Sequence, residues 1–96
     1  MEAISDQSIE AAILAMVRER GLVSTACPSE VARTLAPDGW RPLMQRVRDV
    51  AGNLAAHGQL EIVQKGRAVS TNGPWKGPIR LRLPRVKTRP QQPGLT

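Results

Sequence analysis

Apolar positions recur at helical spacing near the start of the chain. The stripe consists of Ile9, Ile13, Met16 and Val17. Asp6 precedes it as a candidate N-cap, and Gly21 follows it with the backbone freedom that ends many helices. We expect a first helix over residues 7–20.

Two further helical segments follow. Pro28 and Glu30 are typical of the first turn of a helix, with Cys27 at the cap position, and Pro37 ends that short helix. The next segment opens at residues 38–39 and closes at Gly58. Its apolar stripe, Leu43, Val47, Val50 and Leu54, predicts the longest helix of the chain.

From Leu60 onward the apolar period changes from helical to alternating. Leu60 and Ile62 are predicted on one face of a strand, with Glu61, Val63 and Lys65 on the other. A loop rich in Gly, Pro, Ser and Asn follows, and then Ile79, Leu81 and Leu83 alternate with arginines. The two runs predict an antiparallel hairpin.

This order of elements predicts an α+β fold, mainly α, of the winged helix-turn-helix class: three helices plus a two-stranded wing. The hairpin is needed because three short helices alone leave an apolar face open to water. A short β-leaning stretch over residues 22–25 lies between the first two helices. We expect an N-terminal extension (1–6), a winged-helix domain (7–84) and a basic, disordered tail (85–96).

Five strings along the chain resemble a small bacterial family of uncharacterised proteins, the domain of unknown function 3253. They are IEAAIL (residues 9–14), CPSEVAR (27–33), WRPLM (40–44), QKGR (64–67) and GPIRL (77–81). The resemblance covers residues 7–84. It implies a winged-helix fold, a bacterial origin and an intracellular location, and it implies no activity.

The composition narrows the function further. Among 96 residues there is no Phe or Tyr, one Cys and one His, so the core is aliphatic and metal-ligating side chains are few. No nucleophile with a base, no phosphate-binding glycine loop and no apolar run long enough to span a bilayer is present. We therefore expect a cytoplasmic protein that is not an enzyme, has no cofactor or metal and does not enter membranes.

Charge is distributed unevenly along the chain. Residues 1–39 hold three basic and six acidic side chains, whereas residues 40–96 hold eleven basic and two acidic ones. No carboxylate side chain follows Glu61, although eight Lys or Arg residues do. Such asymmetry favours a polyanion as partner. A merely solvated basic surface with a basic tail explains the same composition.

The favoured function is binding of duplex nucleic acid, with DNA as the expected ligand. The third helix would enter the major groove, and Gly52 would permit close backbone approach. The wing would contact phosphates, with Glu61 able to pair with one of its arginines. The predicted nucleic-acid-binding residues are Arg41, Gln45, Arg48, Lys65, Arg67, Lys76, Arg80 and Arg82.

Other interpretations remain open at this stage. The same surface fits a protein–protein adaptor that meets an acidic partner and binds no nucleic acid. A thiol at a helix N-terminus is a candidate redox switch, although Cys27 also fits a simple capping position. Trp40 fits the core, whereas Trp75 either folds back on the hairpin or stacks on a base. The oligomeric state and the target sequence are not encoded in any pattern of the chain.

Overall fold

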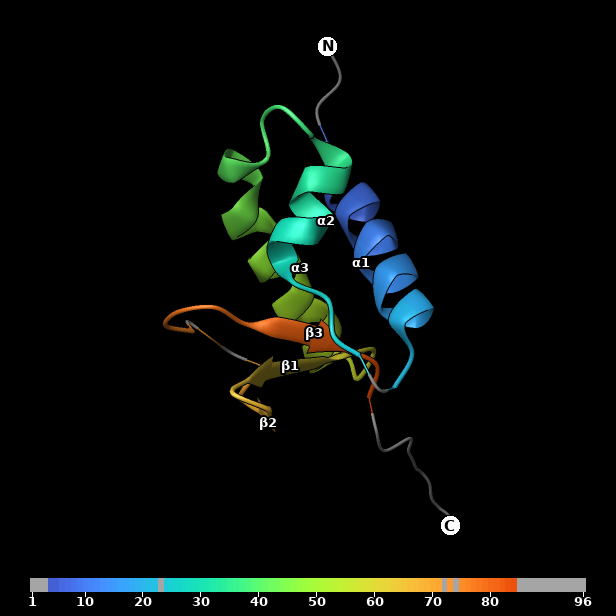
Figure 1. The fold of residues 1–96 in the computed structure, drawn as a ribbon, viewed down its shortest axis with the longest axis vertical. Helices are drawn as coiled ribbons and strands as arrows, with labels where there is room; N and C mark the ends of the chain where they lie inside the picture. The colour runs from blue at the N-terminus through green and yellow to red at the C-terminus, as the bar shows by residue number, and fades with distance from the viewer. Residues whose placement is uncertain (1–3, 23, 72, 74, 85–96) are drawn as a thin grey trace.

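A computed structural model describes residues 4–22, 24–71, 73 and 75–84 (Figure 1). Helices α1 (Asp6–Arg20), α2 (Pro28–Leu35) and α3 (Met44–Ala56) pack against one another above a small sheet. The sheet contains β1 (Glu61–Gln64), β2 (Arg67–Ala68) and β3 (Arg80–Arg82) in the order β2-β1-β3, with both pairings antiparallel. Three helices followed by an antiparallel sheet agree with the predicted fold class.

The cap of α1 differs from the prediction by one residue. The Ser5 side chain accepts a hydrogen bond from the Ser8 backbone N–H, at 3.1 Å, so Ser5 is the N-cap and Asp6 lies in the first turn. Ser and Asp are both good caps, and the sequence pattern does not separate neighbours. The predicted inner stripe is confirmed at Ile9, Ile13 and Val17, all fully buried.

Helix α2 begins at the predicted cap and is tied to α1. The Glu30 carboxylate accepts a hydrogen bond from the Cys27 backbone N–H at 2.8 Å. It also accepts hydrogen bonds from both terminal guanidinium nitrogens of Arg20, Nη1 at 3.2 Å and Nη2 at 2.9 Å. Arg20 also donates to the Thr25 carbonyl at 2.7 Å. The hydrogen bond from Arg20, followed by that from Cys27, lowers the pKa of Glu30 below its ordinary value.

This lowered pKa predicts acid-sensitive stability. Because the unfolded chain binds a proton more tightly at this site, the stabilisation from Glu30 is complete above the unfolded pKa of about 4.3 and is lost as pH falls through the lower folded pKa. We expect Glu30→Gln to cost about 1 kcal/mol at pH 7, a figure moderated by the partial exposure of the pair. Urea unfolding at pH 7 and pH 3 measures it. Equal costs at both pH values would contradict the assignment, and exposed Glu10→Gln serves as control.

The third helix is shorter than predicted. A 3-10 turn, η1 (Arg41–Leu43), precedes α3, which has 13 residues against 15 in α1, so α1 is the longest helix. Pro42 lies in this first turn, where its missing N–H costs little. Residues 38–39 belong to a turn in which the Gly39 N–H donates to the Ala36 carbonyl at 3.1 Å.

The sheet has three strands where two were expected. Lys65 and Gly66 both have positive φ, 51° and 80°, and form a two-residue turn between β1 and β2. The predicted alternation is also wrong at Val63, which is 2% exposed. The described residues of the predicted β-leaning stretch, 22, 24 and 25, belong to no strand, and Ala26 makes a single antiparallel bridge with Leu81.

One aliphatic core joins the helices to the sheet. Its large, fully buried members are Ile9, Ile13, Val17, Val31, Val47, Ile62, Ile79 and Leu81. No described helix combines the length and the apolar character that crossing a membrane requires. The disorder predicted for the tail, residues 85–96, lies outside the described residues.

Candidate nucleic-acid interface

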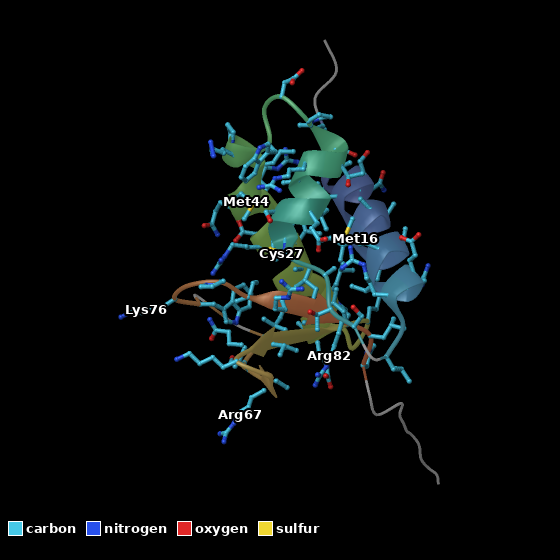
Figure 2. All side chains as sticks on the ribbon, in the orientation of Figure 1. Met16, Cys27, Met44, Arg67, Lys76 and Arg82 are labelled. Carbon is cyan, nitrogen blue, oxygen red and sulfur yellow. The ribbon has the colours of Figure 1, made fainter. Side chains whose placement is uncertain are left out.

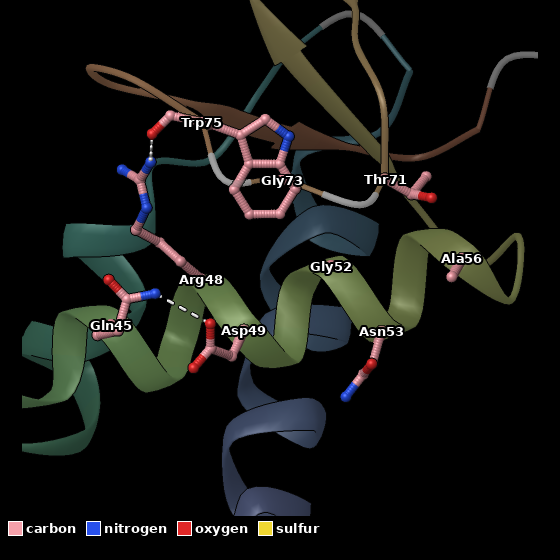
Figure 3. Close-up of a pocket in the computed structure, with 9 residues that line it drawn as sticks. All are labelled: Gln45, Arg48, Asp49, Gly52, Asn53, Ala56, Thr71, Gly73 and Trp75. Carbon is pink, nitrogen blue, oxygen red and sulfur yellow. Dashed lines mark hydrogen bonds between the residues drawn. The ribbon is translucent and has the colours of Figure 1, made fainter.

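The loop between β2 and β3 lies against α3. We call its described residues, 69–71, 73 and 75–79, the wing loop. At Gly52, a Cβ atom would stand 3.0 Å from the Trp75 ring and 3.3 Å from the Thr71 carbonyl oxygen. The Trp75 indole N–H donates to the Ser70 carbonyl at 2.7 Å, which fixes the ring over the helix (Figure 3). The close approach predicted at Gly52 is therefore made by the protein's own tryptophan.

Arg48 holds the wing loop to α3. Its guanidinium donates to the carbonyl oxygens of Trp75, at 2.7 Å, and Gly77, at 3.2 Å, and lies 5.9 Å from the Trp75 ring centroid. Figure 3 shows the side chain pointing from the helix toward the loop. Arg48 was predicted to contact base edges, but the wing loop engages two of its five N–H donors.

A groove remains open beside this contact. It has a volume of about 450 Å³ and lies between the outer side of α3 and the wing loop. Its polar lining comes from Gln45, Arg48, Asp49, Asn53 and Thr71. Gln45 donates to Asp49 through Nε2–Oδ1 at 2.9 Å, along the helix surface (Figure 3).

Two polar α3 residues of this groove were not predicted. Asp49 and Asn53 follow Gln45 at intervals of four residues, and all three are exposed. The predicted face, with Arg48 and Gly52, lies on the side of the helix that the wing loop covers. The i, i+4, i+8 spacing was a usable signal for Asp49 and Asn53, but only the position of the wing loop decides between the two faces.

Arg41 lies at the start of η1, beside a second arginine. The guanidinium carbons of Arg33 and Arg41 are 4.5 and 4.8 Å from the centroid of the Trp40 ring. Trp40 is half-buried and packs against the core, as predicted. Both arginines are exposed, and neither makes an ion pair within the described part of the chain.

Three predicted wing cations extend into solvent. Lys65, Arg67 and Lys76 are exposed, and none has an ion-pair partner among residues 4–22, 24–71, 73 and 75–84. Figure 2 shows Lys76 at the bend of the wing loop and Arg67 at β2, both extending away from the ribbon. Gln64 holds the loop near β1 by donating to the Lys76 carbonyl at 2.7 Å.

The two strand arginines have partners within the fold. Arg82 pairs with Glu61, directly opposite on β1, at 2.8 Å, and its side chain is only 14% exposed. This is the cross-strand pair that the sequence suggested. Arg80 donates to the Thr25 hydroxyl at 2.7 Å. The eight predicted residues thus divide into exposed cations, groove residues and side chains engaged in internal contacts.

Cys27 and His57 have local partners. The Cys27 sulfur lies 3.1 Å from the Ser29 hydroxyl, and His57 Nδ1 lies 2.7 Å from the Asn53 carbonyl oxygen. No group of three metal-ligating side chains occurs in the described ranges.

Residues 6–84 match the family described as "Protein of unknown function (DUF3253)". The chain belongs to this family. The DUF3253 match covers all three helices and all three strands, so the α3–wing groove lies wholly within the family region. A search of curated proteins finds no match to the chain.

Proposed function

We propose that this DUF3253 protein binds duplex nucleic acid, with DNA as the expected ligand, in the bacterial cytoplasm. The observation that carries the proposal is a set of exposed cations on the sheet and wing loop, without ion-pair partners among the described residues, in a fold that also leaves a polar face of α3 exposed. Lys65, Arg67 and Lys76 would contact phosphates, and the exposed side of α3 would face the major groove.

The dimensions support this arrangement. A helix of 13 residues is about 20 Å long, and the major groove, about 12 Å wide, admits an α-helix. The bonds from Arg48 to the wing loop fix Lys76 relative to α3. A fixed wing lowers the ordering cost of binding, because its cations need not be collected from a mobile loop.

The proposal predicts that the wing, and not the tail, carries the salt-dependent affinity. Replacing Lys65, Arg67 and Lys76 together by Gln is expected to weaken binding to duplex DNA by about 10–100-fold. The log–log salt slope should fall by about one for each lost phosphate contact. Fluorescence anisotropy of the full chain with a mixed-sequence duplex, over a salt series, measures both quantities.

A variant of equal net charge separates binding at the wing from non-specific attraction by the positive charge of the whole protein. Replacing Arg85, Lys87 and Arg89 by Gln lowers the formal net charge from +6 to +3, as the wing variant does. The proposal predicts that this tail variant keeps most of the affinity. Loss confined to the tail variant, or equal loss in both, would overturn it, as would the absence of DNA binding by the unaltered chain.

A further inference from the structure

The wing loop determines which part of α3 is open to a ligand. Trp75 covers Gly52, and two N–H groups of Arg48 are bonded to the loop, while both residues also border the open groove. Gln45, Asp49 and Asn53 remain exposed along one side of the helix and line the open groove (Figure 3). A base edge that enters the groove beside these three residues meets amide and carboxylate groups.

We propose that Asp49, oriented by Gln45, is a specificity-determining residue that selects cytosine in the major groove. This inference rests on the proposed function. The Gln45 side-chain amide donates a hydrogen bond from Nε2 to Asp49 Oδ1 at 2.9 Å, which leaves the other carboxylate oxygen to accept a hydrogen bond from a ligand. An ionised carboxylate donates none, so it requires a donor on the base edge.

Cytosine satisfies this requirement best. Its N4 amino group is a donor with only the C5–H beside it on the same ring, whereas the adenine N6 amino group adjoins the N7 acceptor. Guanine and thymine present acceptors at the equivalent positions, and an acceptor would meet the carboxylate without a proton between them. Asp49 therefore discriminates by repulsion as well as by attraction.

The charge of Asp49 supports a contact with a base. Beside the phosphate backbone a carboxylate weakens binding, so an acidic residue on the exposed side of α3 lowers affinity for every duplex. On the groove floor the same charge meets an amino group. Affinity and specificity should consequently change in opposite directions when the charge is removed.

The test compares Asp49→Asn with Asp38→Asn. Both raise the formal net charge from +6 to +7, and Asp38 is an exposed residue in the turn before η1. Asparagine keeps an acceptor for Gln45 but replaces the second oxygen with a donor. Each full-length protein selects from a duplex DNA library with a randomised central region, and affinities for the selected sites are then measured by anisotropy.

We expect the unaltered protein and Asp38→Asn to select a C·G pair at one position. At that position, Asp49→Asn should lose about tenfold in preference for cytosine while binding random duplex at least as tightly. Unchanged preferences in Asp49→Asn would overturn the inference, as would binding by the unaltered protein without sequence preference; the proposed function survives both results. Absence of binding by the unaltered protein would overturn both proposals.

Discussion

Replacing Leu81 by alanine is expected to lower the free energy of unfolding by about 2–5 kcal/mol. Leu81 is fully buried, pairs with Ile62 across the sheet, and exchanges two backbone hydrogen bonds of 2.7 Å with Ala26. It therefore lies where β1, β3 and the segment before α2 meet. Small domains have about 5–15 kcal/mol of stability in total, so this loss is a large share. Urea unfolding followed by far-ultraviolet circular dichroism measures it.

Leu22→Ala is the matched control. It removes the same atoms from a side chain that is 58% exposed, and we expect a change within about 0.5 kcal/mol. Similar losses at the two positions would show that burial at Leu81 contributes nothing beyond the general effect of the substitution. A cost below about 1 kcal/mol at Leu81 would contradict its central place in the core.

Local signals account for most of the fold. Helical spacing locates α1 through Ile9, Ile13 and Val17 because each is fully buried on one stripe. The pattern of Pro28 and Glu30 locates α2 because the cap hydrogen bond joins Cys27 and Glu30, which are three positions apart. The change to alternation at Leu60 locates β1. These features depend on neighbours within one or two turns of chain, which is the range over which periodicity carries information.

The missed features have weaker local signals. The Lys65–Gly66 turn that creates β2 places a lysine at positive φ, where Asn or Asp is the usual signal. Val63 departs from the alternation, since it is buried although it lies on the strand face predicted to be exposed. The third helix begins later than predicted because the 3-10 turn η1 precedes it, and the sequence pattern does not separate a 3-10 turn from the first turn of an α-helix.

The candidate site depends on contacts between distant residues. Arg48 reaches the Trp75 carbonyl 27 positions along the chain, and no spacing rule connects the two. The sequence therefore predicted Arg48 as a free cation. The exposed cations Lys65, Arg67 and Lys76 were predicted correctly as exposed, because they follow the last acidic side chain of the chain. The same reasoning does not foresee that Arg80 and Arg82 have partners within the fold. The proposed use of Lys76 depends on the wing loop staying against α3.

Replacing Gly52 by valine is expected to destabilise the protein by about 1–3 kcal/mol, because the new side chain overlaps the Trp75 ring. The Cβ alone would lie 3.0 Å from that ring and 3.3 Å from the Thr71 carbonyl oxygen, and the Ser70 bond prevents the indole from turning away. Urea unfolding measures the loss. In a Trp40→Phe background, where Trp75 is the single tryptophan, its emission should move to longer wavelength as the loop leaves the helix.

A double-mutant cycle tests whether Trp75 is the cause. In a Trp75→Ala background the valine should cost less than about 0.5 kcal/mol, since it replaces a helix-destabilising glycine without meeting a ring. Gly39→Val provides the control, because no atom outside its own neighbours lies within 4 Å of the new Cβ. An equal cost of Gly52→Val with and without Trp75 would mean that the Trp75 ring is not the cause, and that the Thr71 carbonyl oxygen at 3.3 Å, or the valine itself, accounts for the loss.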